Sequence, residues 1–295
     1  MKLGGWIILD KPLGLSSAQG VAAVKRILRS AGLTVPRIGH GGTLDPLATG
    51  VLPIALGEAT KLAGRMLDAA KGYDFTVSWG RATSTEDAEG EVVAVSDVRP
   101  AVGAIADVLP RFTGPIVQVP PAYSALKVDG KRAYARARAG ETVVLAPRNV
   151  TILALTLIAH DTDSATFSAQ VSKGTYIRSL ARDIAVALGT VGHVTMLRRT
   201  RSGPFALDQA ISLDNLTELV QGAALEQAIL PLMAGLDDIP ALVIDSDQAA
   251  ALRQGRILTG HPASDGTCLA CLGSVPVALV EISQGEVRVL RGFND

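Results

Sequence analysis

The residue in this chain best placed to do chemistry is a single carboxylate with apolar neighbours. Asp45 lies within residues 39–53, whose sequence is GHGGTLDPLATGVLP. The glycines permit backbone angles that other residues resist, and Pro46 and Pro53 disfavour a regular helix or a central strand, so we predict a loop. A solvated turn would surround an aspartate with polar residues, whereas Leu44 and Pro46 flank this one. Such a carboxylate can act as a base or a nucleophile, although the simpler alternative is that it caps a turn.

The charge of the chain is unevenly distributed, although its total is zero. Lys and Arg number 28, as do Asp and Glu. Residues 202–252 contain no Lys or Arg, while residues 111–148 carry seven basic residues against Asp129 and one glutamate. Tyr123 and Tyr134 interleave with these cations, which is typical of a surface that binds looped or single-stranded nucleic acid, although a solvated basic helix is the alternative. Local field attracts a phosphate backbone, so the neutral total does not exclude RNA.

Two further charged segments have simpler explanations. Residues 83–90 (TSTEDAEG) could form a hard-cation site with Asp45 and His40, but a solvated hairpin turn is the preferred interpretation. Lys11, which follows the first apolar run, could meet phosphate, and a solvated side chain is preferred there too.

The cysteines and apolar runs limit the type of protein. Cys268 and Cys271 have the spacing of a zinc site, yet a structural zinc needs four ligands and only His261 lies nearby, so no metal is predicted. Two cysteines are too few for a disulfide framework, which favours a reducing compartment. The N-terminal apolar run is too short for a signal peptide, and no uncharged apolar run reaches the ~18 residues of a membrane span. We therefore predict a cytoplasmic protein without membrane attachment.

The elements that must position these residues follow from hydrophobic periodicity. An apolar run at residues 6–9 predicts a strand, and the next helix is capped by Ser16 or Ser17 and ends before Gly32. In the predicted strand at 73–79, Tyr73 lies on the apolar face, so core packing is the default explanation for its ring. Further helices are predicted at 62–67 (with Leu67 on the apolar face), 102–109, 177–188 and 207–236, and further strands at 151–158, 165–171, 268–272, 276–282 and 286–290.

Residues 40–53 resemble the catalytic motif of the TruB family, the tRNA pseudouridine-55 synthases. The match is long and ungapped, and most of residues 5–205 resemble the family in several motifs that keep its order. These motifs are DKPLGLSS at 10–17, PPAYSALKVDG at 120–130, KGTYIR at 173–178 and GHVTMLRRT at 192–200. The family pattern Asp-Thr-x-Asp-x-x-Gly is altered at its first position, where this chain has Ser84, although Asp87 is kept.

The resemblance implies roles for the matching residues. It makes Asp45 the essential catalytic residue, Tyr73 the ring that stacks on the target base, and Arg178 the ion-pair partner of Asp45. An arginine near a helix start is mildly disfavoured by the helix dipole, so a carboxylate partner would also explain Arg178. Arg199 and Arg201 could meet phosphate. Substrate binding is implied for His40 (filling or holding open the space that the base leaves), Asp87, Lys127, Lys173, Tyr176, Leu197 (lining the uracil pocket) and Arg198.

The implied fold is α+β, with a mixed β-sheet flanked by helices. A catalytic domain at 1–238 would carry a thumb-like RNA-binding insertion at about 118–148, and 239–295 would form a small PUA-like β domain. The implied reaction is isomerisation of uridine 55 in the T arm of tRNA, after base flipping and without a cofactor. Asp45 could attack covalently or act as a base at the ribose. The expected partner is tRNA rather than DNA, and a monomer is expected.

Two other functions remain open from the residues alone. A nucleoside or glycoside hydrolase would use a pair of carboxylates, for which Asp45 and Asp87 are candidates, and it would release free uracil. A tRNA chaperone with an inert loop would keep all of its function after Asp45→Asn.

Overall fold

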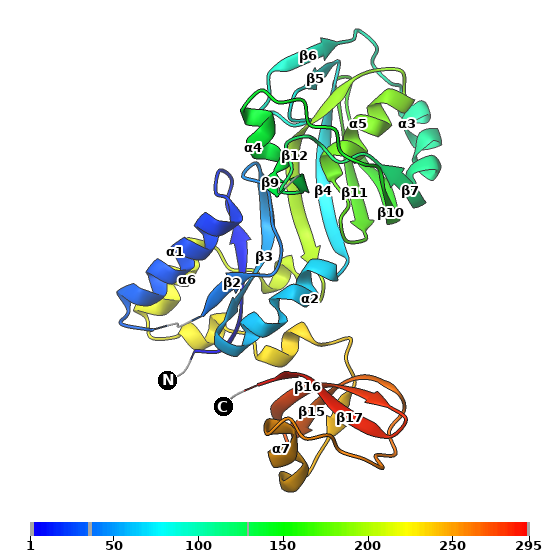
Figure 1. Ribbon diagram of the computed structural model, residues 1–295. Helices are drawn as coiled ribbons and strands as arrows, with labels where there is room; N and C mark the ends of the chain where they lie inside the picture. Colours follow the sequence, from blue (N-terminus) through cyan, green and yellow to red (C-terminus); the bar gives the residue numbers. More distant parts are fainter. Residues whose placement is uncertain (1–2, 35–36, 129, 294–295) are drawn as a thin grey trace.

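The computed structural model describes residues 3–34, 37–128 and 130–293, and Asp129 of the basic segment lies outside them. It has a large mixed sheet with helices and a small C-terminal β domain, which confirms the expected fold class (Figure 1). Within these residues the large sheet has nine strands, in the lateral order β1-β3-β12-β4-β11-β10-β7, with β2 beside β3 and β13 beside β12. These are β1 (Gly5–Lys11), β2 (Ile38–His40), β3 (Ala48–Leu56), β4 (Lys71–Trp79), β7 (Gly114–Gln118), β10 (Arg148–His160), β11 (Ser164–Val171), β12 (Gly192–Ser202) and β13 (Phe205–Ala206).

One pair of strands at the centre of the large sheet is parallel, whereas the strands on either side of this pair are antiparallel to it. β3 and β12 pair in parallel over Ala48–Gly50 and Leu197–Arg199, whereas β3 is antiparallel to β1, and β12 to β4. Asp45 precedes β3 by three residues and therefore lies at one end of this parallel seam. The seam brings Leu197 next to the loop that carries Asp45.

One half of the sheet is covered by two helices distant in sequence. α1 (Ser17–Ser30) and α6 (Leu213–Gln221) pack on β1 and β3 through a core that includes Ile7, Leu28 and Leu52. α1 begins with a capping box, in which Ser16 Oγ accepts from the Gln19 amide and the Gln19 side chain accepts from the Ser16 amide. The predicted N-terminal strand and capped helix are thus confirmed.

The other half of the sheet holds the helix that carries Arg178. α5 (Ile177–Ala187) and α3 (Val102–Val108) pack against β4, β10 and β11 through a core in which Phe75 and Phe167 stack at 5.3 Å (Figure 1). Residues on one face of α5, such as Leu180 and Ile184, are fully buried. The remaining pieces of this half are the hairpin of β5 (Arg81–Thr83) and β6 (Val92–Val95), the short strands β8 (Lys127–Val128) and β9 (Lys131–Arg132), and α4 (Ala133–Arg138). α2 (Ala63–Asp68) packs with β1 and β3 instead, since Met66 shares a core with Trp6 and Val51.

The C-terminal sheet packs against the large one. β14 (Ala241–Val243), β15 (Gly266–Leu272), β16 (Val275–Ser283), β17 (Glu286–Gly292) and α7 (Ser246–Arg253) enclose their own core. Leu269 and Phe293 instead join a core that contains Trp6 and Phe205. Cys268 packs inside the small domain, while Cys271 faces the core around Trp6, so the two thiols do not point at one site.

The prediction of a loop across residues 39–53 is wrong for most of that stretch. β2 and β3 occupy both of its ends, and Pro53 lies inside β3, opposite Ile8. The Pro53 carbonyl accepts from the Gly41 amide at 2.8 Å, just beyond the end of the ladder between β2 and β3. Because the amide and the carbonyl of a strand residue point to the same side, the N–H that Pro53 lacks would face the β2 side of β3. The ladder between β2 and β3 ends at Ile54, so Pro53 removes no hydrogen bond from it.

Two helix predictions were also only partly right. Within residues 207–236 the structure has α6 and the 3-10 turns Leu207–Gln209, Leu225–Ala228 and Leu232–Gly235 rather than one helical layer. The predicted helix at 62–67 becomes the 3-10 turn Gly57–Leu62 followed by α2. Leu67, expected in the core, is 54% exposed because it lies at the rim of a pocket.

Candidate active site

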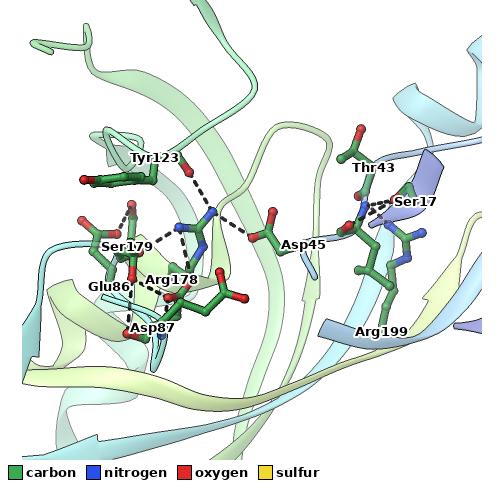
Figure 2. A network of polar contacts seen from close by, with 12 residues as sticks. Ser17, Thr43, Asp45, Glu86, Asp87, Tyr123, Arg178, Ser179 and Arg199 are labelled. Atoms are coloured by element: carbon green, nitrogen blue, oxygen red, sulfur yellow. Dashed lines mark hydrogen bonds and ion pairs between the residues drawn. The ribbon is translucent and has the colours of Figure 1, made fainter. Parts of the chain in front are cut away.

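Residues 41–47, between β2 and β3, hold Asp45 in a short loop tied to the start of α1 (Figure 2). The hydroxyl of Ser17 accepts from the Leu44 amide at 2.7 Å and donates to the Leu44 carbonyl at 3.1 Å. The Asp45 carbonyl accepts from the Ala48 amide at 3.0 Å, which closes a turn just before β3. The residues on either side of the carboxylate are therefore fixed by hydrogen bonds.

A buried arginine holds both sides of this loop. Arg199 is 1% exposed; its Nε donates to the Val51 carbonyl at 2.7 Å and its Nη1 to the Thr43 carbonyl at 3.1 Å. We expected that Arg199 could meet phosphate. This expectation is wrong for the structure, because β12 places the side chain in the interior, where its guanidinium group binds main-chain carbonyls. Gly50 adopts φ +98°, and a Cβ there would lie 2.2 Å from the Arg199 carbonyl oxygen, so the seam requires glycine.

Lys11 is also buried, which corrects the expectation of a solvated side chain. It is 0% exposed, and its Nζ donates to the carbonyls of Leu15 at 2.6 Å, Pro12 at 3.0 Å and Pro46 at 3.4 Å. Burial lowers the pKa of Lys11 to about 8, against the attraction of Asp45. The ammonium group thus joins the strand before α1 to the residue that follows Asp45.

The predicted ion pair between Arg178 and Asp45 is present (Figure 2). Arg178 Nη2 lies 2.8 Å from Asp45 Oδ2, and the same nitrogen donates to the Tyr123 carbonyl at 3.0 Å. Arg178 Nη1 donates to the Thr85 carbonyl at 2.8 Å and lies 3.4 Å from Asp87 Oδ2. One guanidinium therefore connects the Asp45 loop, the turn at 83–90 and the 118–124 segment.

Residues 83–90 form the predicted hairpin turn, between β5 and β6, with Ser84, Ala88 and Glu89 exposed, but the Asp87 side chain is buried rather than solvated. That side chain is 7% exposed; its Oδ1 accepts from the Thr85 hydroxyl and from the Glu89 amide. The Asp45 side chain, by contrast, is 39% exposed. Asp87 therefore compensates the charge of Arg178 in the interior, while Asp45 keeps a face open to a ligand.

A pocket of about 310 Å³ opens beside Asp45. Tyr73 from β4, Leu197 from β12 and Tyr176 contribute to its wall. Burial raises the pKa of Tyr176 above its ordinary value, and Gln118 fixes its backbone, donating to the Tyr176 carbonyl at 3.1 Å and accepting from its amide at 2.8 Å. The full wall also includes Gly42, Thr43, Leu44, Leu67, Lys71, Ser124, Ala125, Leu126, Val171, Ser172, Gly174, Thr175, Ile177, Arg178 and Arg199.

His40 is the last residue of β2 and is not among the residues of the pocket wall given above. Its Nδ1 is buried and has no hydrogen-bond partner among residues 3–34, 37–128 and 130–293. Burial lowers the pKa of His40, a backbone hydrogen bond of Gly42 opposes this, and the Arg199 charge adds to it. The expectation that His40 fills or holds open the space that the base leaves stays a prediction.

The other basic residues predicted to bind substrate lie outside the pocket wall. Arg198 Nη2 pairs with Asp10 at 2.8 Å, and Lys173 Nζ pairs with Asp68 at 2.9 Å. Lys127 in β8 is exposed. Arg201 is exposed too and donates to the Gly203 carbonyl. Their contacts with RNA remain predictions, and Arg198 and Lys173 would have to share their cations with a carboxylate.

Several residues of this site were not found from the sequence. Lys71 lines the pocket, and its Nζ donates to the carbonyls of Met66, Leu67 and Ala69 at 2.6–2.8 Å. Burial lowers the pKa of Lys71 to about 8. Lysine is rarely buried, and nothing near it in the sequence signals burial, since its carbonyl partners become neighbours only when α2 ends against β4. For Ser17 the sequence contained a weak indication, because it is a second serine next to the helix cap and only one serine is needed for capping.

No helix in the described ranges is long and apolar enough to cross a membrane.

Comparison with known proteins agrees with this geometry. Residues 25–177 match the model of the TruB family pseudouridylate synthase N-terminal domain, and residues 178–237 match that of the tRNA pseudouridylate synthase B C-terminal domain. The tRNA pseudouridine synthase B of Novosphingobium aromaticivorans is 65% identical over 295 residues, covering 98% of this chain and 97% of the relative. The protein of the same name from Zymomonas mobilis is 59% identical over 292 residues, covering 99% and 96%.

Two solved structures of multi-component complexes contain a chain with the same fold. An H/ACA RNP bound to a substrate RNA containing 2′-deoxyuridine includes a chain with a TM-score of 0.76 and 26% identity, covering 99% of this chain and 85% of that one. A Cbf5–Nop10–Gar1 complex gives a TM-score of 0.76 and 29% identity, covering 98% and 85%. Together with the Asp45–Arg178 pair at the pocket, these matches show that the chain belongs to the TruB family of pseudouridylate synthases.

Proposed function

We propose that this protein converts uridine 55 in the T arm of tRNA to pseudouridine, with Asp45 as the essential group and without a cofactor. The observation that carries the proposal is a half-exposed carboxylate, paired with a buried arginine, at the edge of a pocket large enough for a pyrimidine base. The relatives named tRNA pseudouridine synthase B support tRNA as the substrate.

The target base must leave its stack to reach Asp45. Extruding a nucleotide costs a few kcal/mol, which stacking and hydrogen bonds in a pocket offset. Tyr73 offers an aromatic face and Leu197 an aliphatic one in the pocket wall, and Tyr176 adds a second ring. We assign the stacking role to Tyr73 and the opposite apolar contact to Leu197.

The chemistry uses the Asp45 carboxylate, which the Arg178 guanidinium contacts at 2.8 Å. In the reaction the bond from C1′ to N1 breaks, the base turns, a bond from C1′ to C5 forms, and the C5 proton is lost while N1 gains one. Asp45 serves either as a nucleophile or as a base at the ribose. Because the reaction is an isomerisation with no net redox change or hydrolysis, it calls for no cofactor.

The basic insertion (residues 118–148) is our candidate for the surface that holds the tRNA backbone. Lys127, Lys131 and Arg132 are exposed on β8 and β9, and Arg138 is exposed on α4, where it lies 5.7 Å from the ring of Tyr134. Cations beside an aromatic ring suit a looped RNA, which offers both phosphates and unstacked bases. The 118–124 segment that joins this insertion to the sheet also contacts Arg178, which brings bound RNA to the pocket.

Tritium release from a tRNA transcript labelled with [5-³H]uridine tests the proposal, because the new carbon–carbon bond displaces the C5 hydrogen. Wild-type protein should release tritium, Asp45→Asn should not, and a transcript with cytidine at position 55 should release none from that site. Asn has the shape of Asp, so equal unfolding midpoints and equal RNA binding would assign the loss to chemistry.

The same assay separates the alternatives. Free uracil among the products would identify a hydrolase; against this, Asp87 is buried on Arg178 and is poorly placed as a second carboxylate for substrate. RNA binding without tritium release from wild type would contradict the proposed function and favour a chaperone.

A further inference from the structure

A second arginine on α5 repeats the pattern of Arg178 one helical turn later. Arg182 Nη1 pairs with Glu86 Oε1, its Nε lies 2.9 Å from Asp183 Oδ1, and its Nη2 donates to the Val119 carbonyl at 3.1 Å. Glu86 Oε2 also accepts from the Ser179 hydroxyl at 3.0 Å. Neither residue lines the pocket beside Asp45, so this cluster has no part in the reaction as proposed above.

Glu86 is held in an unusual backbone conformation. Its φ is +64°, a left-handed conformation that residues other than glycine rarely adopt because the Cβ crowds the backbone. The Glu86 carbonyl accepts from the Val194 amide at 3.0 Å, so its main chain binds β12 while its side chain binds α5. Burial raises the pKa of Glu86, and the Arg182 charge opposes this. A strained backbone and a buried carboxylate persist only where surrounding contacts enforce them.

The neighbours of Glu86 in sequence are the residues that bind Arg178. The Thr85 carbonyl accepts from Arg178 Nη1, and Asp87 lies 3.4 Å from that nitrogen. Figure 2 shows Glu86, Asp87 and Ser179 on one side of the Arg178 guanidinium and Asp45 on the other. A rotation of α5 or a shift of the turn would therefore move Arg178 relative to Asp45.

Both arginines also bind the 118–124 segment. Arg182 reaches the Val119 carbonyl and Arg178 the Tyr123 carbonyl at 3.0 Å. The 118–124 segment is thus joined to the same helix at two points, and the Glu86–Arg182 pair lies outside the pocket wall.

We propose that Glu86 and Arg182 form a positioning pair, which fixes the 83–87 turn against α5 and thereby sets the placement of the Arg178 guanidinium at Asp45. The pair touches no reacting atom in this assignment. It acts through Arg178, so its effect should appear in the chemical step and vanish when Arg178 is altered. The kinetic part of this inference rests on the proposed function.

The kinetic test is a double-mutant cycle under single-turnover conditions with saturating tRNA. Glu86→Gln and Arg182→Gln should each slow the chemical step on the order of 10- to 100-fold, since displacements of about 1 Å at reacting groups have effects of that size. RNA affinity should stay within about twofold. In an Arg178→Lys background, Glu86→Gln should have little further effect. Asp163→Asn, which removes an exposed ion pair with Arg99 at 2.7 Å, is the matched control and should keep the wild-type rate.

Arginine side-chain NMR tests the positioning without any turnover. The guanidinium signals of Arg178, assigned with Arg178→Lys, should show restricted rotation in wild type and in Asp163→Asn, and averaged or shifted signals in Glu86→Gln. Unchanged Arg178 signals in Glu86→Gln would overturn the inference, even if wild type lacked synthase activity. If Glu86→Gln slowed the reaction by the same factor in the Arg178→Lys background as in wild type, the inference would also be overturned. Independent effects of this kind are expected when a substitution destabilises the protein generally rather than acting through Arg178.

Discussion

At the scale of single residues, the site is organised by one cation shared between unequal carboxylates. Asp87 is buried and satisfied by the Thr85 hydroxyl and the Glu89 amide, whereas Asp45 is 39% exposed. A buried arginine without a partner would be costly, and Asp87 supplies a partner that no substrate needs to displace. Asp45 can therefore change its contacts during a reaction while Arg178 stays charge-compensated.

His40 should make the fold sensitive to acid. Its folded-state pKa lies below the ordinary value of 6.5, mainly through burial, so the unfolded chain binds more protons below about pH 6.5. The stability contribution of this group is therefore present above that pH and is lost as the pH falls. In His40→Gln, the difference in unfolding midpoint between about pH 7.5 and pH 5.5 should be smaller than in wild type, by thermal denaturation. An equal difference in both proteins would contradict this account.

At the scale of elements, the parallel seam between β3 and β12 carries the loop. Lys11 binds the Pro46 carbonyl and Arg199 the Thr43 carbonyl, so the loop is fixed by buried cations rather than by side-chain packing alone. Lys71, which lines the same pocket, binds carbonyls at the end of α2. Main-chain carbonyls are weaker partners than carboxylates, and burial accordingly lowers the pKa of both lysines to about 8.

Gly50 should be the glycine at which this seam is most sensitive. Gly50→Ala would force a Cβ to 2.2 Å from the Arg199 carbonyl oxygen at φ +98°, and should cost about 2 kcal/mol or more together with most activity. Gly64→Ala in α2 is the control; nothing lies within 4 Å of its Cβ, and alanine should be neutral or up to about 1 kcal/mol stabilising there. Urea denaturation measures both. A Gly50→Ala protein as stable as Gly64→Ala would contradict the close approach at the seam.

At the scale of the whole molecule, the small β domain shares a core with the large sheet. Leu269 and Cys271 from β15 and Phe293 pack into the cluster that holds Trp6 and Phe205. Lys61 also donates to the Gly292 carbonyl at 2.8 Å, and Arg65 pairs with Asp238 at 3.1 Å. We expect the two parts to unfold together, because separating them would expose this shared core to water.

Leu269→Ala tests that coupling. Leu269 is 2% exposed, so its truncation should cost about 2–5 kcal/mol and shift one common transition. The fully buried Trp6 at the shared core should report that transition by fluorescence, together with far-UV circular dichroism. Val243→Ala on β14, where the side chain is 76% exposed, should change stability by less than about 0.5 kcal/mol. A separate early transition that leaves the Trp6 signal unchanged would show that the parts unfold independently.

The sequence by itself determined the features that depend on local pattern. The helix cap, predicted at Ser16 or Ser17 and found at Ser16, and the strand around Phe75 are short-range features, so periodicity and cap chemistry located them. The family motifs located Asp45 and Arg178 as partners, because a long ungapped match carries information that spacing alone lacks. The rule that proline interrupts a central strand gave the wrong result at Pro53, which lies inside β3. Its missing N–H costs no ladder hydrogen bond there, because the ladder with β2 ends one residue away.

Only the tertiary structure decided which charged residues are buried. Lys11, Arg199 and Asp87 have sequence neighbours that suit a solvated surface. Each is buried beside a partner that is distant in sequence: the Pro46 carbonyl for Lys11, the Thr43 and Val51 carbonyls for Arg199, and the Arg178 guanidinium for Asp87. Glu86 is the clearest case, since its positive φ follows from simultaneous contacts to β12 and α5. Desolvating a charge is favourable only when distant groups converge on it, and that convergence is a property of the folded chain, not of any local stretch.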